Sequence, residues 1–275
     1  MKLLKGKKIS EKILKGLKIR IKKEKTKPGL AVILIGKNPA SDIYVRLKEK
    51  AARRVGIKFF LYRFPERSRE AEIIKKIKKL NADKKISGII VQLPLPKKFH
   101  TQMIINAIDP KKDADGFHPG NLKSFLKNKD GVYPVLPKAI LKFLKGTFRK
   151  EVRVAIIANS KKFGEIMVLA LKQEGIRGQH ILYKNYKKSL PVFRRTDILI
   201  TAVGKPKFIK GEMIKKGAII IDGGITKSGK KVLGDVDSSS VKNKASYLTP
   251  VPGGVGPVTI ACLLENVYLL SKKSR

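Results

Sequence analysis

The chain has 275 residues and a formal net charge of +42, from 63 Lys and Arg against 21 Asp and Glu, and 42% of its residues are hydrophobic. This length and apolar content suit one large or two small domains with a real core. No apolar run reaches the roughly 18 residues of a membrane span, and the opening "MKLLKGKKIS" lacks the apolar stretch of a signal peptide. Cys262 is the only cysteine, which excludes an intrachain disulfide. We therefore expect a soluble, cytoplasmic protein with no membrane partner.

The high positive charge admits two interpretations. Clustered Lys and Arg neutralise phosphates, as in a nucleic-acid-binding protein. Here the lysines are spread over polar faces of expected helices, as in "IKKEKTK" at 21–27 and "IIKKIKKL" at 73–80, and they are not interleaved with aromatic residues. This favours a solvated basic surface that steers an anionic small substrate. We therefore expect no specific nucleic-acid partner, and any such binding to be weak and to fade at physiological salt.

The first half of the chain alternates between strand and helix patterns. Apolar runs predict strands at 29–36, 57–64 and 88–96, and amphipathic segments predict helices at 40–56 and 69–81. Such a βαβαβ order implies a mostly parallel sheet with helices on both faces.

After a break at 109–121 the rhythm restarts, with no internal repeat. The patterns predict helices at 138–148, 164–175 and about 257–271, and strands at 151–158, 180–183, 197–203, 217–224 and 245–248. The fold class is therefore α/β, with two α/β halves that divide near residue 120. We expect residues 1–119 and the C-terminal helix 257–275 in the first domain and residues 120–256 in the second.

Polar residues gather where ligands of open α/β sheets bind, beyond the carboxyl ends of the strands. Gln92 closes the strand "GIIVQ", and Asp113 and Asp115 lie in the loop "KKDADGFHP". Tyr44 and Lys48 share one face of the helix that follows the first strand. A lysine in a dry cleft has a lowered pKa and serves in proton transfer, although most helix lysines of this chain are simply solvated.

The segment "PVPGGVGPVT" at 250–259 combines proline at three positions with several glycines. Proline fixes φ, and glycine permits positive φ and close approach of a ligand. The segment joins an expected strand to an expected helix. It is either an irregular linker or a rigid loop of defined shape.

Seven motifs follow one another along the chain: "NPASDIYVRLKEKAARRVGI", "GIIVQLPLP", "KDADGFHP", "TDILITAVGKPKFI", "IKKGAIIIDGGI", "GDVD" and "TPVPGGVGPVTIACLLEN". In this order, and over nearly the whole chain, they resemble the bifunctional methylenetetrahydrofolate dehydrogenase/cyclohydrolase family. The resemblance implies oxidation of 5,10-methylene-tetrahydrofolate to the methenyl cation with NADP, or with NAD, and hydrolysis of that cation to 10-formyl-tetrahydrofolate. It also implies an N-terminal α/β catalytic domain and a Rossmann-like dinucleotide-binding domain that flank a cleft. A place in one-carbon metabolism and a homodimer formed through the second domain are implied as well.

Roles for individual residues follow from the resemblance alone. Lys48 is implied to manage the proton of the attacking water, Gln92 to bond and tune Lys48, and Tyr44 to pack on the folate and order Lys48. Asp115 is implied to bind the pterin, whose N–H groups suit a carboxylate acceptor. The implied wall between the folate and nicotinamide sites consists of Pro252, Gly253 and Gly254.

The implied cofactor contacts are Ala158, Asn159, Ser160, Gly164, Gly223, Ile225 and Thr259. The family's Gly-Arg-Ser is Ala158-Asn159-Ser160 here, and its later Gly-Arg-Pro is Gly164-Glu165-Ile166. The arginines are therefore missing, and Lys161 and Lys162 stand nearby. One alternative is a cyclohydrolase with a weak or lost dehydrogenase step or a relaxed cofactor preference.

A second alternative is a basic nucleic-acid-binding protein on the same scaffold, which has no need of the Tyr44, Lys48, Gln92 and Asp115 set. Among the other polar residues, we expect Asp113 to have a turn or cap role. We expect His118 to form a structural hydrogen bond. No Cys/His spacing indicates a metal site, and we expect none.

Overall fold

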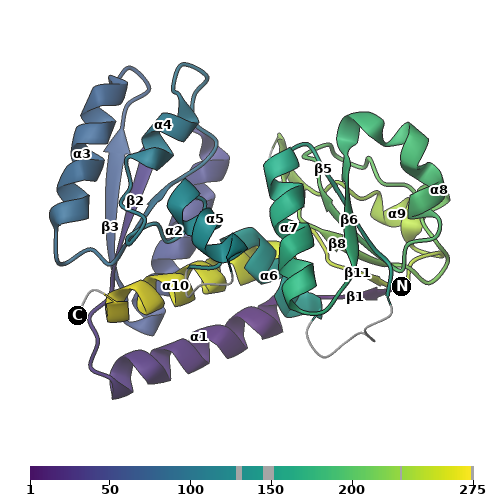
Figure 1. Cartoon of the computed structure of the whole chain (residues 1–275), viewed down its shortest axis with the longest axis horizontal. Helices are drawn as coiled ribbons and strands as arrows, with labels where there is room; N and C mark the ends of the chain where they lie inside the picture. The colour runs from purple at the N-terminus through teal and green to yellow at the C-terminus, as the bar shows by residue number, and fades with distance from the viewer. Residues whose placement is uncertain (128–131, 145–151, 230, 274–275) are drawn as a thin grey trace. The chain divides into compact units, whose positions relative to one another are not determined.

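The computed structural model describes residues 1–127, 132–144, 152–229 and 231–273, and the chain divides into two compact units (Figure 1). The first unit comprises residues 11–135 and 260–275, and the second comprises residues 1–10 and 136–259. Among the described residues, no helix is both long and apolar enough to cross a membrane.

The first unit is built on a three-stranded parallel sheet in the order β3-β2-β4. Its strands are β2 (Gly29–Ile35), β3 (Lys58–Phe64) and β4 (Gly88–Val91), and its helices are α2 (Pro39–Val55), α3 (Glu70–Ala82), α4 (Thr101–Asn106) and α5 (Pro119–Leu126). Most of α1 (Gly6–Lys23) and the end of α10 (Val255–Lys273) also belong to this unit. The predicted βαβαβ order is confirmed.

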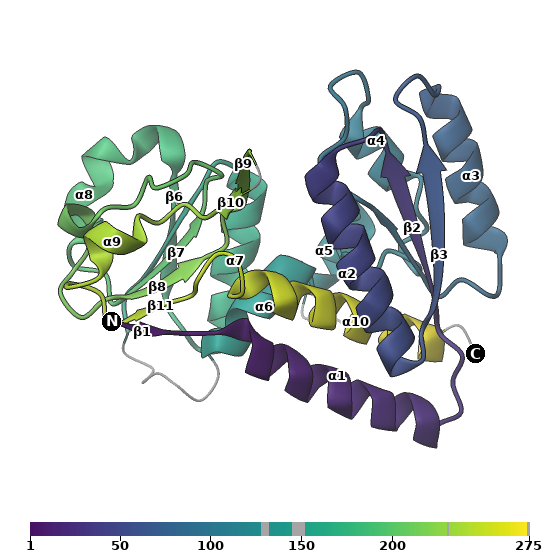
Figure 2. The ribbon, with the colours of Figure 1, turned by 180° about the vertical axis from the view of Figure 1, so that it is seen from behind.

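The central strand β2 is buried along its whole length. One of its faces packs against α3 and α4 in a core of Ala31, Ile33, Ile35, Ile73, Ile77, Leu80, Ile104 and Ile108. Figures 1 and 2 show α2 on the other face of the sheet. Burial on both faces explains why "GLAVILI" is apolar throughout instead of alternating.

Local sequence sets the ends of α2 and β4. The side chain of Asn38 accepts from the N–H groups of Ala40 and Ser41 at 2.9 and 3.2 Å, which caps α2. Gly56 ends the helix with φ of 89°. Strand β4 stops at Val91, short of the predicted 88–96, because Pro94 has no N–H to donate to a ladder.

The second unit contains a six-stranded parallel sheet in the order β1-β11-β8-β7-β5-β6. These strands are β1 (Lys2–Leu3), β5 (Val154–Ala158), β6 (Gly178–Leu182), β7 (Ile198–Ala202), β8 (Ile219–Asp222) and β11 (Tyr247–Leu248). A hairpin joins β9 (Thr226–Ser228) and β10 (Lys231–Leu233). The helices are α6 (Val135–Leu144), α7 (Lys161–Gln173), α8 (Leu190–Phe193), α9 (Ser238–Val241) and the start of α10, with short 3-10 turns η1 (Tyr183–Asn185), η2 (Lys187–Ser189) and η3 (Gly211–Met213).

The division of the chain differs from the predicted boundaries at both ends of the second unit. Residues 1–10 join it because β1 pairs with β11, where Lys2 lies opposite Tyr247. Residues 120–135 join the first unit, where the Asn121 amide donates to Asp113 at 3.0 Å. The division within α10 falls after Thr259, close to the predicted 257. The end of the predicted helix 138–148 and the start of the predicted strand 151–158 lie outside the described residues.

Helix α7 lies against β6 at a point of very close contact. A Cβ added to Gly164 would lie 2.1 to 2.3 Å from three ring atoms of His180. All three atoms belong to the ring itself, so an alanine at position 164 requires the whole ring to turn about χ1 or the helix to move away from the strand. Close helix–strand packing of this kind is one task of glycines at the first turn of a dinucleotide-binding fold.

We therefore expect Gly164→Ala to lower the free energy of unfolding by about 1–3 kcal/mol, the typical cost of overpacking. The matched control is Gly16→Ala in α1, where an added Cβ meets no atom within 4 Å. That change should leave stability equal or raise it by up to about 1 kcal/mol, through helix propensity. Urea unfolding of both variants measures the difference. Equal stabilities would contradict the packing argument.

Candidate active site

The centre of the candidate site is a hydrogen bond between two elements of the first unit. Lys48 Nζ, on α2, donates to Gln92 Oε1, just after β4, at 2.6 Å. Gln92 is in turn held at both ends: its backbone N–H donates to Ile33 O on β2 at 2.8 Å, and its side-chain Nε2 donates to Leu93 O at 2.7 Å. The amide group therefore cannot rotate freely, and its oxygen points at the amine. This confirms the predicted proximity of Lys48 and Gln92.

The surroundings perturb the ionisation of three of the predicted site residues. Burial lowers the pKa of Lys48, and the charge of Asp115 partly opposes that change. Burial raises the pKa of Asp115 to about 6, against the opposing effect of Lys48. Burial also raises the pKa of Tyr44. Lys48 and Asp115 each keep some exposed surface, yet enough protein surrounds both for the loss of hydration to dominate.

The loop that carries Asp115 is organised by Asp113. The carboxylate of Asp113 is 1% exposed and accepts from the N–H groups of Gly116 at 3.1 Å and His118 at 2.8 Å. Asp113 also forms an isolated bridge with Ile89 of β4, so the loop runs beside the sheet. His118 Nδ1 accepts from the N–H of Gly120 at 3.0 Å and caps α5. The predicted turn role of Asp113 and the structural hydrogen bond of His118 are confirmed.

Asn266 of α10 supports this loop, and its role was not predicted from the sequence. Asn266 is fully buried, and its side-chain N–H groups donate to Ala114 O and Tyr133 O, both at 2.9 Å. These bonds fix the backbone directly before Asp115. The signal was an asparagine within the otherwise apolar run "IACLLENVYLL", where a buried amide requires partners.

In the second unit, basic side chains gather at the carboxyl edge of the sheet. Lys161 and Lys162 follow β5, Lys184 follows β6, and Lys205 follows β7. The carboxyl ends of parallel strands share one edge, and there the N-terminus of α7 also begins. Cations and a helix N-terminus at one edge fit the phosphates of an anionic dinucleotide such as NADP.

The altered residues of the cofactor loop have structural partners of their own. Asn159 donates through its side chain to Val203 O, and the Ser160 hydroxyl caps α7 by accepting from the N–H of Phe163 at 3.1 Å. Ala158 and Gly164 are buried, so their side chains offer no surface to a ligand. A cofactor contact at these two positions would come from backbone atoms.

Two of the remaining predicted cofactor residues lie in a turn beside a buried carboxyl pair, Asp222 and Asp235. Gly223 and Ile225 follow β8, and Ile225 is 45% exposed. The Thr259 hydroxyl donates to Gly256 O at 2.7 Å within α10. Burial, with the charge of Asp235 nearby, raises the pKa of Asp222 to about 7.

These two carboxyls fix the turn after β8. Asp222 accepts from the N–H of Gly224 at 2.9 Å, and Asp235 accepts from the Thr201 hydroxyl at 2.7 Å and the Val203 N–H at 2.6 Å. The backbone that carries Gly223 is therefore held from two neighbouring strands.

Residues 250–254 form a defined loop of the second unit, and residues 255–259 are the first residues of α10. Gly253 has φ of 102°, and its carbonyl accepts from the Gly6 N–H at 2.8 Å. A Cβ added to Gly254 would lie 2.5 Å from Pro250 O. These contacts favour the predicted rigid loop, with Pro252 at its turn, over an irregular linker.

Among the described residues, no group of three or more His, Cys, Asp or Glu is placed to hold a metal ion.

The fold and these sites define a two-domain α/β enzyme with an N-terminal catalytic domain and a dinucleotide-binding domain. Residues 4–115 match the family model of the tetrahydrofolate dehydrogenase/cyclohydrolase catalytic domain, and residues 134–275 match that of its NAD(P)-binding domain. The chain belongs to the tetrahydrofolate dehydrogenase/cyclohydrolase family.

Individual relatives agree with this assignment. The bifunctional protein FolD of Acetivibrio thermocellus is 43% identical over 98% of this chain and 97% of its own. The crystal structure of the bifunctional FolD dehydrogenase/cyclohydrolase of Campylobacter jejuni is 38% identical, with a TM-score of 0.91 over 99% of each chain. The Trypanosoma brucei FolD, solved with NADP cofactor and an inhibitor, is 30% identical, with a TM-score of 0.91 over 99% of this chain and 97% of its own.

The opposed effects on Lys48 generate a prediction about its pKa. Because burial lowers this pKa and the charge of Asp115 raises it, Asp115→Asn should leave the burial effect unopposed and lower the pKa of Lys48 further. The pH dependence of Lys48 acetylation, read by mass spectrometry, measures the change. Asp42→Asn on the same helix is the control, since Asp42 pairs with Arg63 at 2.7 Å and should leave the pKa of Lys48 unchanged. A pKa of Lys48 that stays constant or rises in Asp115→Asn would contradict this electrostatic account.

Proposed function

We propose that the Lys48–Gln92 pair handles the proton in the hydrolytic step of a bifunctional folate enzyme. The chain oxidises 5,10-methylene-tetrahydrofolate to 5,10-methenyl-tetrahydrofolate with NADP and hydrolyses the product to 10-formyl-tetrahydrofolate. The observation that carries the residue assignment is the 2.6 Å bond between an amine with a lowered pKa and a fixed amide oxygen.

The hydrolytic step requires a base near the methenyl carbon. Water adds to this carbon and releases a proton, and the ring then opens. An amine whose pKa is lowered is neutral in a larger fraction of molecules, so Lys48 takes up the proton of the attacking water more readily. Gln92 accepts one N–H of the amine and thereby orients it, while its own bond to Leu93 O keeps the oxygen in place.

Asp115 and Tyr44 are proposed to hold the folate. The pterin presents adjacent N–H donors, and a carboxylate accepts from them with charge assistance. With a pKa raised to about 6, Asp115 gains its full charge only near neutral pH. Tyr44 lies one helical turn before Lys48 on the same face of α2, and its ring is half-buried, which suits packing on the flat pterin and aminobenzoate groups.

The dehydrogenase step requires the second unit to bind the cofactor. When bound, NADP accepts the hydride from the methylene carbon. The chain's part is to hold the cofactor: the N-terminus of α7 and the lysines at the carboxyl edge suit its phosphates, and the exposed Ile225 suits the nicotinamide ring. Pro252, Gly253 and Gly254 are proposed as the wall beside the folate. The homodimer through this unit stays a prediction.

A relaxed cofactor preference is the second proposal, and it follows from the partners of two residues. The side chain of Asn159 is bound to Val203 O and has no charge for a 2′-phosphate. Lys161 Nζ lies 3.7 Å from Glu165 Oε1, and this carboxylate offsets part of the lysine's positive charge. Exposed lysines attract a phosphate only as flexible point charges, worth roughly 0–1 kcal/mol each.

The assignment of Lys48 is tested by Lys48→Met. Loss of a general acid–base group should lower the cyclohydrolase rate by about 10²–10⁴-fold, with circular dichroism and urea unfolding near those of the unsubstituted protein. Lys50→Met is the matched control, since Lys50 is exposed on the same helix and should retain full activity. Hydrolysis by Lys48→Met within a few-fold of the normal rate would remove Lys48 from the mechanism.

The cofactor proposal predicts a preference for NADP over NAD of at most about tenfold in kcat/KM, or roughly 1.4 kcal/mol. The dehydrogenase step should also be slower than the cyclohydrolase step.

Glu165→Gln should release Lys161 and strengthen NADP binding by about two- to fivefold, measured by calorimetry, with NAD binding unchanged. A preference of several hundredfold in the unsubstituted protein would mean that other residues bind the 2′-phosphate. No turnover with either cofactor, beside normal hydrolysis, would leave a cyclohydrolase alone.

A further inference from the structure

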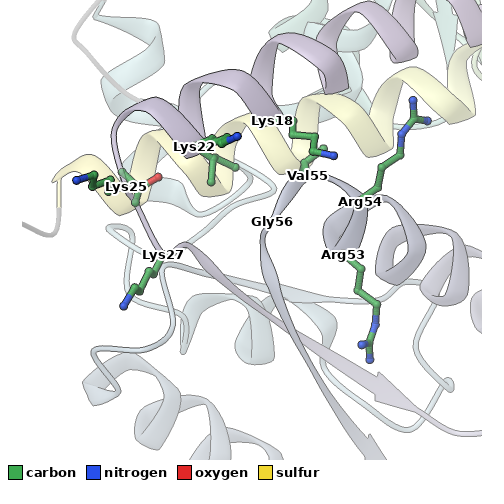
Figure 3. A pocket seen from close by; sticks show the side chains of 10 residues that line it. Lys18, Lys22, Lys25, Lys27, Arg53, Arg54, Val55 and Gly56 are labelled. Carbon is green, nitrogen blue, oxygen red and sulfur yellow. The ribbon is translucent and has the colours of Figure 1, made fainter.

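A basic groove lies in the first unit, where the C-terminal ends of α1 and α2 meet the segment before β2. The groove has a volume of about 620 Å³. Figure 3 shows its charged side chains: Lys18, Lys22, Lys25, Lys27, Arg53 and Arg54. Their charged ends are spread around the opening and are not gathered at one point.

The groove extends along α1 into a second depression. This depression has a volume of about 470 Å³ and shares Lys18, Arg54 and Val55 with the first. It adds Lys12 and Lys15 from the same helix, and one acidic residue, Glu11. Together the two depressions form an elongated surface with eight basic side chains. We call it the α1–α2 groove.

Most of these charges lack an acidic partner. Arg53 pairs with Glu49 at 2.8 Å, but Lys18, Lys22 and Arg54 form no ion pair with any described residue. Like charges held together in this way repel each other, and this repulsion opposes folding. An anion that binds in the groove removes the repulsion.

Helix dipoles explain only some of the lysines. Cations in the last turn of a helix interact favourably with its C-terminal end, which accounts for Lys22 in α1 and for Arg53 and Arg54 in α2. Lys15 lies near the middle of α1, and Lys27 lies beyond its end. The helix dipole does not account for their presence on the same groove.

We propose that the α1–α2 groove binds the phosphodiester backbone of single-stranded RNA without reading its sequence. An elongated groove with dispersed cations matches a chain of regularly spaced phosphates better than it matches one phosphate group. No aromatic side chain lines either depression, so no platform is available on which bases could stack. Binding therefore rests on backbone charge and is strongly salt-dependent.

A membrane surface fits the groove less well than RNA does. Amphipathic surfaces that bind lipid project apolar side chains into the bilayer. In the groove the apolar residues Leu14, Ile21 and Val55 are 6%, 6% and 1% exposed and form the floor, so they do not project from the surface.

The site is also separate from the catalytic residues in sequence and chemistry. Tyr44 and Lys48 occupy the first three turns of α2, whereas the groove begins at Arg53 near its end. Neither Gln92 nor Asp115 lines it. Substitutions in the groove are therefore expected to leave folate chemistry intact.

The test compares two triple variants with the same change in charge. Lys15→Glu/Lys18→Glu/Lys22→Glu removes three groove lysines from α1. Lys75→Glu/Lys78→Glu/Lys79→Glu removes three exposed lysines from α3, outside the groove. Fluorescence anisotropy measures the binding of a labelled 20-nucleotide oligouridine and of a mixed-sequence RNA over a series of KCl concentrations. Cyclohydrolase activity of both variants reports that the first unit is folded.

The unsubstituted protein should bind both RNAs equally, with a slope of log K against log salt of about −4, as expected for about six phosphate contacts. The groove variant should bind at least tenfold more weakly at low salt, with a slope reduced by about 2. The α3 variant should stay within about threefold of the unsubstituted protein. Equal weakening of both variants would show that total charge alone attracts RNA and would overturn the groove assignment, as would the absence of binding at low salt.

Photo-cross-linking of the unsubstituted protein gives a second readout that does not depend on the folding of any variant. An oligonucleotide that contains 4-thiouridine should label peptides within residues 11–27 and 53–56, identified by mass spectrometry. Labels confined to other segments would overturn the proposal. A vesicle of phosphatidylserine and phosphatidylcholine is the competitor, and release of bound RNA by vesicles at equal phosphate concentration would favour a lipid surface instead.

Discussion

The fully buried strand β2 is the constraint on which the catalytic unit depends. Its backbone accepts from Gln92 through Ile33 O at 2.8 Å, and its register with β4 fixes where β4 ends. The bridge between Ile89 and Asp113 then ties the Asp115 loop to the same sheet. The amide of Gln92, the carboxylate of Asp115 and the amine of Lys48 thus belong to three different segments. All three segments are positioned by the apolar strand β2. Because both faces of β2 are buried, the alignment is held by its parallel pairing with β3 from Gly29 to Ile35 and with β4 from Leu30 to Ile33.

The chemistry of Lys48 rests on the choice of an amide as its close partner. A carboxylate at 2.6 Å would stabilise the ammonium and raise the pKa of the lysine, whereas the neutral Gln92 orients the amine without that effect. Burial then dominates, and the more distant Asp115 tempers it. The pKa values of the two groups are displaced toward each other, that of the lysine lowered and that of the carboxyl raised to about 6, and such perturbed pKa values support the proposed role in proton transfer.

Both units bury acids that organise a turn, and Asp113 has this role in the first unit. In the second unit, the acids Asp222 and Asp235 are buried and bound by backbone N–H groups and a threonine, and they hold the turn that follows β8. In the first unit, Lys18, Lys22 and Arg54 of the α1–α2 groove form no ion pair with any described residue. With 63 basic residues against 21 acidic ones, most cations of this chain must remain unpaired. Their distribution, more than their number, therefore carries functional information.

The strand and helix order, the parallel sheets and the proposed set of Tyr44, Lys48, Gln92 and Asp115 could be predicted from the sequence, because hydrophobic period and long motifs are properties of short segments. Tertiary structure alone decided that residues 1–10 belong to the second unit, since the pairing of β1 with β11 joins residues about 245 positions apart. It also decided that Asn266 supports the Asp115 loop and that Gly164 packs on His180. These contacts depend on which side chains meet across the fold, and no pattern along the chain encodes a partner so distant.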